Sequence, residues 1–527
     1  MSMDTKQKMI EEVHKRRTFA IISHPDAGKT TLTEKLLLFG GAIRLAGTVK
    51  GRKASKHATS DWMEIEKQRG ISVTSSVMQF DYEGHRVNIL DTPGHQDFSE
   101  DTYRTLTAAD SAVMLIDSAK GVEAQTKKLF QVCRMRGIPI FTFINKMDRE
   151  GQNPFDLLEE LEQVLGIRSY PMNWPIGSGK QFRGVYDRKL TQVELFQGDD
   201  HKEIQVRKVS GYDDPIVKEI AGDYFYDQLV SDLELLDVAG DEFDLEKVKS
   251  GELTPVFFGS AINNFGVQTF LENFLQLAPT PTPRGSSAGA IDPMSEKFTG
   301  YIFKIQANMN PAHRDRIAFL RICSGKFERG MSVKHVRAGK DIKLAQPQQF
   351  LAQDRDIVEE AYPGDIIGLF DPGIFRLGDS LSQAGNIEFN ELPTFSPELF
   401  SKVTVKNALK HKQFQKGVDQ LTEEGTIQVF RTIGFDDLIL GVVGQLQFEV
   451  FEYRMKGEYG VDVQLQRTNF QFARWIVDEN IDPGKFRINS QLVKDKNDNY
   501  VALFESEYAM RSAMEKNPNA KFLENAP

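Results

Sequence analysis

A segment at residues 23–31 combines the side chains and backbone that a phosphate-binding loop needs. In such a loop, successive backbone N–H groups and the N-terminus of the following helix hold the β-phosphate. A lysine bridges the β- and γ-phosphates and a hydroxyl binds Mg²⁺, and Lys29 and Thr30 fit these roles. Ser23 stands where the strict pattern has its first glycine, although Gly28 keeps the second. We therefore predict a nucleotide-phosphate site with magnesium, formed by Ser23, His24, Pro25, Asp26, Ala27, Gly28, Lys29, Thr30 and Thr31.

A second segment, residues 91–95, places an acid, a glycine and a histidine in one turn. Asp91 would hold Mg²⁺ through water, and Gly94 would let its backbone N–H approach a γ-phosphate closely. His95 would then orient the attacking water, because phosphoryl transfer depends mainly on positioning and charge neutralisation. A lone histidine is more often structural than catalytic, yet its place directly after this turn favours catalysis. The predicted contact residues are Asp91, Thr92, Pro93, Gly94 and His95, with His95 as the catalytic residue.

The third segment, Asn-Lys-Met-Asp at 145–148, could select the base. The Asp148 carboxylate can accept hydrogen bonds from guanine N1–H and from the exocyclic N2 amine, whereas adenine offers neither donor. An unpaired buried acceptor costs about 1 to 3 kcal/mol, so GTP should be preferred to ATP. Lys146 can lie along the purine, and the backbone at 260–261 could contact the base oxygen. The predicted guanine-binding residues are Asn145, Lys146, Met147, Asp148, Ser260 and Ala261.

Each segment follows a short apolar run, and such runs are typical of strands buried on both faces of a parallel sheet. Helical stretches lie between the runs, for example at 29–39 and 123–136. This alternation predicts a doubly wound α/β domain of the P-loop GTPase type, with its ligand at the carboxyl ends of the strands. The apolar runs are 18–22, 87–90, 111–116, 139–144 and 256–258.

A long insertion separates two of the guanine segments, because Ser260 lies 115 residues beyond Asn145. We expect a subdomain at about 155–250, with β-like stretches around 171–196 followed by acidic helices. Residues 213–252 contain thirteen acids and three lysines, and this excess equals the formal net charge of −10 of the whole chain. A solvated acidic helix pair and a docking surface both explain this composition, and the rest of the chain stays free to carry basic faces.

Two further domains are predicted after a proline- and serine-rich linker at 279–287, which breaks both helix and strand. The GTP-binding domain should span 1–283. Residues 294–385 alternate at strand length between glycines, which indicates an antiparallel β-barrel. Residues 390–527 should form an α+β C-terminal domain with the order of a split βαβ unit. Its expected elements are strands at 399–405, 427–431 and 438–441 and helices at 412–424 and 444–456.

The composition is that of a soluble globular protein, and a cytoplasmic location is expected. The N-terminus is charged and no run of roughly 18 apolar residues occurs, so neither a signal peptide nor a membrane span is predicted. The two cysteines, Cys133 and Cys323, are 190 positions apart and have no histidine at ligand spacing. This spacing argues against a disulfide framework and against zinc.

The segments resemble those of the translational GTPases, and essentially the whole chain resembles the bacterial class II peptide-chain release factors, the release factor 3 family. The resemblance implies a ribosome-dependent GTPase that works with Mg²⁺ and GTP or GDP in translation termination. It also implies binding to the ribosome after stop-codon hydrolysis, promotion of the departure and recycling of class I release factors, and action as a monomer without a membrane partner. The resemblance rests on the three nucleotide segments and on 15–23, 60–64, 68–72, 97–98, 298–309 and 360–365.

The first switch of these relatives has a threonine where Ser72 stands. Serine keeps a hydroxyl and a carbonyl for magnesium and the γ-phosphate, so Ser72 joins Thr30 and Asp91 as a predicted metal ligand, with Thr74 as the alternative. Residues 50–57 are basic, and both a solvated loop and a switch that touches ribosomal RNA would fit this composition. A solvated helix face and contact with ribosomal RNA are likewise both open for Lys402, Lys406, Lys410, His411, Lys412 and Lys416.

Two related GTPases differ from this chain in length and spacing. Elongation factor Tu also has three domains, but its guanine segments lie close together. Elongation factor G resembles this chain in having the insertion, yet it carries two further C-terminal domains, for which the roughly 140 residues after the predicted barrel leave no room. The alternatives that stay open are a translocation-type elongation GTPase and a ribosome-binding protein that senses the nucleotide without productive hydrolysis.

Overall fold

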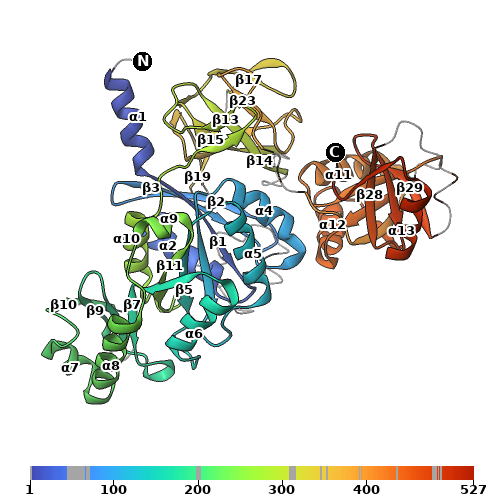
Figure 1. The fold of residues 1–527 in the computed structure, drawn as a ribbon. Helices are drawn as coiled ribbons and strands as arrows, with labels where there is room; N and C mark the ends of the chain where they lie inside the picture. Colours follow the sequence, from blue (N-terminus) through green and yellow to red (C-terminus); the bar gives the residue numbers. More distant parts are fainter. Residues whose placement is uncertain are drawn as a thin grey trace.

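The computed structural model folds the chain into a central α/β domain, a β-domain and a C-terminal α+β domain (Figure 1). In Figure 1 the β-domain lies above the central domain, and the C-terminal domain lies to the right. Among the described residues, no helix is both long and apolar enough to cross a membrane. The residues that the structure describes are 3–43, 66, 72–197, 203–307, 316–344, 347–351, 354–390, 392, 394–434, 437–477, 484, 486 and 489–526.

The central domain is built on a seven-stranded sheet in the order β2-β3-β1-β4-β5-β11-β6. The five apolar runs all form strands of this sheet, and these strands pair in parallel. The apolar runs do not predict the two edge strands: β2 (Ser76–Tyr82) pairs antiparallel with β3, and β6 (Arg168–Pro171) pairs parallel with β11. The predicted strands are β1 (Arg16–Ser23), β3 (His85–Asp91), β4 (Ser111–Asp117), β5 (Ile140–Asn145) and β11 (Leu253–Phe258).

Helices cover both faces of this sheet, which confirms the doubly wound α/β fold. Because side chains alternate along a strand, Ala20 and Ile22 of β1 share a core with α5, whereas Phe19 and Ile21 share a core with α2 and α10. The helices of this domain are α2 (Lys29–Phe39), α4 (Ser99–Thr107), α5 (Ala124–Met135), α6 (Pro154–Glu160) and α10 (Val267–Leu277).

A smaller antiparallel sheet, in the order β10-β9-β8-β7, protrudes from the central domain (Figure 1). In the sequence it lies between β6 and β11. The insertion begins later than the predicted residue 155, because α6 and β6 belong to the central domain and β6 pairs with β11. It also ends earlier than residue 250, because Val248 packs in the core beside β11. Its elements are β7 (Asn173–Ile176), β8 (Gly184–Asp187), β9 (Gln192–Gln197), β10 (Glu203–Lys208), α7 (Pro215–Ala221) and α8 (Asp223–Ala239), followed by α9 (Leu245–Ser250).

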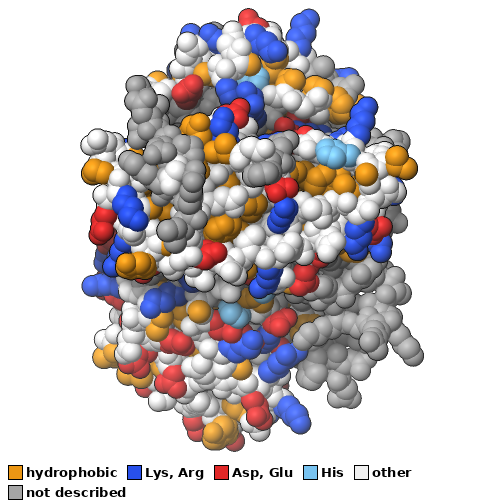
Figure 2. Space-filling view, turned by 90° about the vertical axis from the view of Figure 1, so that its right-hand side faces the viewer, with side chains coloured by type: hydrophobic (Ala, Val, Ile, Leu, Met, Phe, Trp, Pro, Cys, Tyr) orange, Lys and Arg blue, Asp and Glu red, His pale blue; other side chains and the backbone are white. Residues whose placement is uncertain are grey.

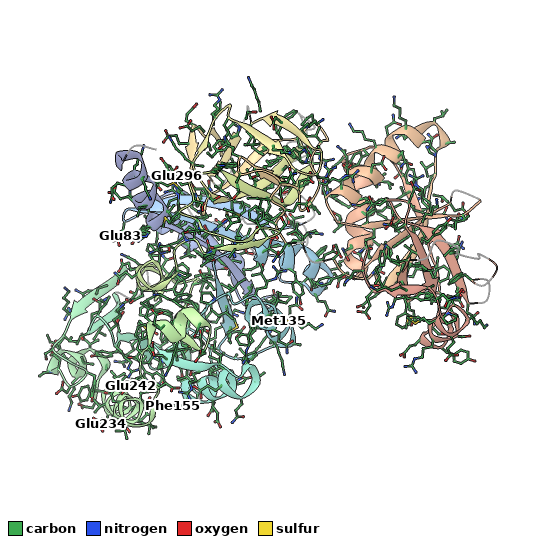
Figure 3. The ribbon with its side chains drawn as sticks, turned by 45° about the horizontal axis from the view of Figure 1, so that its top comes forward. Glu83, Met135, Phe155, Glu234, Glu242 and Glu296 are labelled. Carbon is green, nitrogen blue, oxygen red and sulfur yellow. The ribbon has the colours of Figure 1, made fainter. Side chains whose placement is uncertain are left out.

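The acids of the insertion have more than one use. Asp214 and Asp244 accept backbone hydrogen bonds at the N-termini of α7 and α9, where an acidic cap stabilises a helix. Glu234 lies on α8, and Glu242 lies beside the central domain, where its neighbour Asp241 pairs with Arg168 of β6; both are far from the C-terminal domain (Figure 3). Part of the acidic composition is therefore local capping, and a docking role for the rest stays a prediction.

The β-domain is an eight-stranded antiparallel sheet in the order β18-β17-β23-β14-β15-β22-β19-β20, beside a short β16-β21 pair. The sheet surrounds one core that includes Phe298, Ile302 and Leu320. The N-terminal helix α1 (Met3–Lys15) packs on this domain through Val13 and Tyr362. The strands are β14 (Thr299–Ala307), β15 (Arg316–Ser324), β16 (Phe327–Glu328), β17 (Ser332–His335), β18 (Lys340–Lys343), β19 (Pro347–Leu351), β20 (Asp354–Ile357), β21 (Glu360–Ala361), β22 (Ile366–Phe370) and β23 (Ser380–Ser382).

The C-terminal domain begins with the split βαβ order, and each predicted element lies within one residue of the observed one. Further strands, which the sequence did not predict, extend the same sheet to eight strands in the order β27-β24-β26-β25-β29-β30-β28-β31. The elements are β24 (Leu399–Val405), α11 (His411–Glu423), β25 (Gln428–Thr432), β26 (Leu438–Val442), α12 (Gln445–Gly457), β27 (Val463–Arg467), β28 (Phe472–Val477), β29 (Ser490–Lys494), β30 (Tyr500–Phe504), α13 (Glu507–Lys516) and β31 (Lys521–Leu523).

Candidate nucleotide-binding site

The three predicted segments meet at the carboxyl edge of the central sheet. Residues 23–28 leave β1, residues 91–95 leave β3, and residues 145–148 leave β5. Ile21 pairs with Asp91 across β1 and β3, so the first two loops start side by side. Loops at this edge of an open α/β sheet form the usual ligand crevice of such folds.

The phosphate loop is tied to the guanine segments by one side chain. Asn145 donates from Nδ2 to the Ala27 carbonyl oxygen at 2.9 Å, and its Oδ1 accepts the backbone N–H of Ala261 at 2.9 Å. Gly28, which precedes α2, has a φ of 101°, and a Cβ there would overlap the Asn145 amide. Both the left-handed backbone and the lack of space require glycine at this position.

Lys29 and Asp91 lie together in the buried centre of the site. The Lys29 ammonium donates to Oδ1 of Asp91. Oδ2 of Asp91 is buried and has no hydrogen-bond partner among the described residues. A buried carboxylate oxygen without a partner is unfavourable, and a hard cation prefers oxygen ligands of this kind. Thr30, half-buried at the start of α2, adds a hydroxyl, so the donor set fits Mg²⁺.

The second segment packs directly against the phosphate loop. The Thr92 hydroxyl donates to the Ile21 carbonyl oxygen at 2.7 Å, which fixes the start of the turn on β1. A Cβ on Gly94 would lie 3.4 Å from both the backbone N and the Cα of Pro25. This is an ordinary van der Waals distance, so the two loops lie side by side and a Cβ at Gly94 would still fit between them.

His95 follows this turn and is one-third exposed, with 34% of its side chain accessible. Its Nδ1 lies 3.1 Å from Oδ1 of Asp97 and 3.3 Å from the backbone N of the same residue. Its ring is thus held from one side, while its catalytic role stays a prediction.

The guanine segments contact one another as well. The Ser260 hydroxyl donates to Oδ1 of Asp148 at 2.6 Å, so this serine orients the base-reading carboxylate through its side chain. Lys146 has a positive φ of 69°, and its ammonium donates to the Asp26 carbonyl oxygen at 2.5 Å. The backbone N–H of Met147 donates to the Gly259 carbonyl oxygen at 3.1 Å. These contacts bring both predicted guanine segments against the phosphate loop.

Asp117 belongs to the site although the motifs did not single it out. Its Oδ2 accepts a hydrogen bond from Lys146 at 2.6 Å. Burial alone would raise the pKa of the Asp117 carboxyl, but hydrogen bonds from Lys146 and from the Ala119 backbone outweigh burial and lower the pKa below its ordinary value. The available signal was its place at the end of the buried run 111–116, the same place that Asp91 has after its own run.

Residues 44–65 and 67–71 lie outside the described residues, so the predictions for 50–57, 60–64 and 68–71 fall there. Ser72 itself is described and half-buried, and its assignment as a metal ligand stays a prediction. The alternative, Thr74, lines a cavity of about 40 Å³ where the central, β- and C-terminal domains meet. Its place in that cavity makes Thr74 the weaker candidate for a magnesium ligand.

The basic residues of the C-terminal domain are only partly engaged. Lys402 pairs with Asp437 at 2.6 Å, and Lys410 donates to the Gly460 carbonyl oxygen. Of the predicted basic residues on α11, His411, Lys412 and Lys416 are exposed. In the view from the C-terminal side, Lys and Arg side chains are interspersed with acidic and hydrophobic ones (Figure 2). Contact with ribosomal RNA therefore stays a prediction.

Three family models together match most of the chain. The Elongation factor Tu GTP binding domain model matches residues 14–280, which is half of the chain. The Elongation factor G domain 2 model matches residues 297–384, and the model of the C-terminal domain of class II release factor RF3 matches residues 389–514. Their order agrees with the three observed domains.

Curated relatives match over nearly their whole length. A protein from Symbiobacterium thermophilum named Peptide chain release factor 3 is 61% identical over 518 residues, 98% of each chain. Proteins of the same name from Listeria innocua and Enterococcus faecalis are 58% and 57% identical, and each alignment covers 97% of this chain and 98% of the relative. A solved structure from Thermus thermophilus has a TM-score of 0.70 at 23% identity and covers 92% of this chain and 72% of that chain, a likeness of fold.

Identity at this level over nearly the full length is enough to show the family. The C-terminal model separates it from elongation factors that share the first two domains. The chain belongs to the peptide chain release factor 3 family of translation-termination GTPases.

Proposed function

We propose that the protein hydrolyses GTP when it is bound to the ribosome and that His95 orients the attacking water. The observation that carries this proposal is the pair of hydrogen bonds by which Asn145 joins Ala27 of the phosphate loop to Ala261 of the guanine segment. Because the loops are already assembled, binding energy is not needed to form the site, and it can act on the transition state.

In this proposal Lys29 would leave Asp91 for the β- and γ-phosphates, and the backbone N–H of Gly94 would meet the γ-phosphate. Asp148, held by Ser260, would read guanine. Thr30, Asp91 and Ser72 would hold Mg²⁺, which when bound neutralises charge on the β- and γ-phosphates.

We further propose that the GTP-bound protein binds the ribosome after peptide release and promotes the departure of class I release factors, and that hydrolysis then releases the protein itself. The support is the family relation over nearly the full chain. A ligand can shift an equilibrium only through its different affinity for two states, so GTP would act by ordering the switch segments. We expect the protein to carry out this role in the cytoplasm and to act as a monomer.

The test is a recycling assay on stop-codon complexes that carry a labelled class I release factor. We expect this protein with GTP to accelerate release of the label, and a non-hydrolysable analogue to leave this protein trapped on the ribosome. Movement of transfer RNA instead would favour the translocation-type alternative. Phosphate release that ribosomes do not stimulate would favour the nucleotide sensor.

The role of His95 is tested in the same system with His95→Ala. Removing the imidazole should reduce ribosome-stimulated phosphate release by at least about 100-fold, because general acid–base and water-orienting groups contribute about 10²- to 10⁴-fold. The Kd for GTP should change little. Unchanged turnover would remove His95 from the catalytic role and leave GTP binding untouched.

A further inference from the structure

Asp97 contacts two domains with its two carboxylate oxygens. Oδ1 lies 3.1 Å from Nδ1 of His95, and Oδ2 accepts the backbone N–H of Leu446 at 2.7 Å. Leu446 belongs to the first turn of α12 in the C-terminal domain, 349 residues away in sequence. Only 7% of Asp97 is exposed, so water competes little for either contact.

The first turn of α12 has no side-chain cap of its own at the N-cap position. Helix N-termini leave N–H groups without partners, and a Ser, Thr, Asp or Asn at the N-cap usually accepts from them. The N-cap here is Gly444, which has no side chain and an extended backbone that any residue can adopt. A Cβ on Gly444 would overlap the Asp97 carboxylate. Gly444 therefore leaves the space in which Asp97 of the central domain caps the helix.

Apolar packing supports the same contact. Phe98, which follows Asp97, packs with Val450 of α12 and with Val73 in one buried cluster. Val73 follows Ser72, the residue predicted for the first switch, and Phe98 lies just after the turn that carries His95. α12 thus contacts the chain at the end of the first predicted switch and directly after the second.

The two groups of Asp97 that face His95 favour opposite hydrogen-bonding states of its ring. Nδ1 faces two groups, the carboxylate at 3.1 Å and the Asp97 backbone N at 3.3 Å. The carboxylate can accept only from a protonated Nδ1, which leaves Nε2 free to accept a hydrogen bond from water. The backbone N–H can donate only to an unprotonated Nδ1, which puts the proton on Nε2. In this structure the Asp97 N–H donates to Nδ1. The carboxylate beside it, at 3.1 Å, would favour the other tautomer, in which Nε2 accepts from water.

We propose that Asp97 is a positioning residue that links the tautomer and orientation of His95 to the docking of α12. The inference rests on the role proposed for His95. When α12 is docked, Leu446 anchors Oδ2, which keeps Oδ1 3.1 Å from Nδ1. When the C-terminal domain moves away, Asp97 loses its anchor and its hold on the ring weakens. Movement of the C-terminal domain on the ribosome would therefore control hydrolysis through one carboxylate.

The decisive variant, Gly444→Ala, lies outside the central domain. The new methyl group would displace Asp97 or α12, so we expect GTP hydrolysis to slow by about 10- to 100-fold, in single-turnover reactions both without and with ribosomes. The Kd of a fluorescent GTP analogue should stay within about twofold, because the nucleotide loops are untouched. The matched control is Gly457→Ala at the other end of α12, where a Cβ meets nothing within 4 Å; it should behave as the parent protein.

A second variant separates docking from the tautomer. In Asp97→Asn the amide oxygen can still accept from Leu446, so hydrogen exchange of the amides at 443–448 should stay slow. Its NH₂ group can only donate to Nδ1, which keeps the proton on Nε2 and removes the carboxylate that would favour a protonated Nδ1, so hydrolysis should still fall. Ring ¹⁵N shifts of histidine-labelled protein, assigned with His95→Ala, should show the change of tautomer. Adding Gly444→Ala to Asp97→Ala should cause no further loss, because the contact is already absent.

The outcomes are distinguishable. If His95→Ala leaves hydrolysis unchanged, the proposed function of His95 fails. If His95→Ala slows hydrolysis but Gly444→Ala and Asp97→Asn match the parent, the function stands and the link is wrong. A faster rate in Gly444→Ala, or additive losses in the double variant, would also overturn the link.

Discussion

The central domain meets its two neighbours through very different interfaces. Against the β-domain, Asp110 is buried and binds two arginines: Arg321 at 2.5 Å and Arg284 at 2.8 Å. Tyr301 donates to the Thr107 carbonyl oxygen at 2.6 Å, and its ring belongs to the same hydrophobic cluster as the strands of the central sheet. The core of one domain thus continues into the other.

Against the C-terminal domain the contacts are fewer and local. They include the Asp97 carboxylate on Leu446, a long hydrogen bond of 3.4 Å from Arg104 to the Gly425 carbonyl oxygen, and the small cluster around Phe98. A cavity of about 40 Å³ lies in the same junction. It is large enough to hold water, so the side chains there are packed less densely than in a protein core.

The difference between the two interfaces indicates which domains can move relative to one another. Separating the β-domain from the central domain would expose Arg321 and a shared core, whereas separating the C-terminal domain from the central domain would break fewer contacts. The C-terminal domain is also bound to the β-domain, where the Ala307 N–H donates to Glu424 at 2.7 Å and Arg316 pairs with Glu423. Proteins switch at interfaces with two accessible arrangements. We therefore expect the first two domains to act as one unit, and the C-terminal domain to respond to the nucleotide.

The largest predicted effect comes from breaking the fixed interface with Asp110→Asn. The change leaves the buried Arg321 and the half-buried Arg284 without their counter-charge, and breaking a buried ion pair in this way costs about 3 to 5 kcal/mol. We expect the urea midpoint of unfolding to fall accordingly, as measured by circular dichroism.

The matched control for this variant is Asp81→Asn. Asp81 pairs with Arg86 at 3.0 Å, but 70% of its side chain is exposed, so its loss should cost less than about 1 kcal/mol. Equal effects of the two substitutions would show that the Asp110 cluster does not hold the β-domain.

These interfaces also mark what could be predicted from sequence. The nucleotide loops follow from local order, since a glycine, lysine and hydroxyl after a buried strand carry their chemistry in adjacent positions. The strands at 18–22 and 111–116 follow from continuous apolar runs. No local pattern marks Asp110 or Gly444, because their partners lie far away in sequence and only the tertiary fold brings them together.

The remaining errors have similar causes. β6 carries alternating exposure, and without its partner β11 its sequence could not be assigned to the central sheet, which misplaced the start of the insertion. The sequence motifs do not indicate Asp117, because they assign Lys146 only a contact with the guanine base, whereas its ammonium also donates to Asp117. Elements with strong periodicity, such as α11 and α12, were placed within one residue.

The inserted sheet belongs to neither interface, so a stabilising change there should leave hydrolysis unaffected and can be compared with changes at the two interfaces. Burial raises the pKa of Glu194 to about 8, and the nearby charges of Asp187 and Glu272 add to this shift. The unfolded chain ionises this group near 4.5, so it binds fewer protons than the folded chain between these values. Stability should therefore fall as pH rises from the unfolded toward the folded pKa, and the full loss should be present above about pH 8.

Glu194→Gln should remove this loss. The melting temperature of the variant should match that of the parent near pH 5 and exceed it increasingly toward pH 9. At pH 9 the free energy of unfolding should be higher in the variant by roughly 2 to 4 kcal/mol. Calorimetry at the two pH values checks the sign. Glu242→Gln, at an exposed position, should show no such trend. Hydrolysis should stay unchanged in both, and a change would mean that the insertion influences the site.

Val450→Ala tests the adjustable interface. Deleting two methyl groups beside Phe98 should cost about 1 to 2 kcal/mol of docking energy. That amount would shift the ratio of docked to undocked protein by about 5- to 30-fold. GTP hydrolysis should slow in proportion to the docked fraction that is lost. The control is Val463→Ala in the interior of the C-terminal domain, which should reduce the stability of that domain without slowing hydrolysis. Equal slowing by both variants would show that the effect of Val450→Ala does not come from lost docking.

Tyr301→Phe is the smallest change and the closest counterpart of Val450→Ala. It removes one buried hydroxyl from the fixed interface and takes the Tyr301 donor away from the Thr107 carbonyl oxygen, at a cost of about 1 kcal/mol. The shared core and the Asp110 cluster remain, so the domains should stay together and hydrolysis should match the parent. Val450→Ala and Tyr301→Phe would then cost similar free energies with different consequences: the first would slow hydrolysis and the second would leave it unchanged. Slowed hydrolysis in Tyr301→Phe, measured as phosphate release, would show that the β-domain also transmits movement to the nucleotide site.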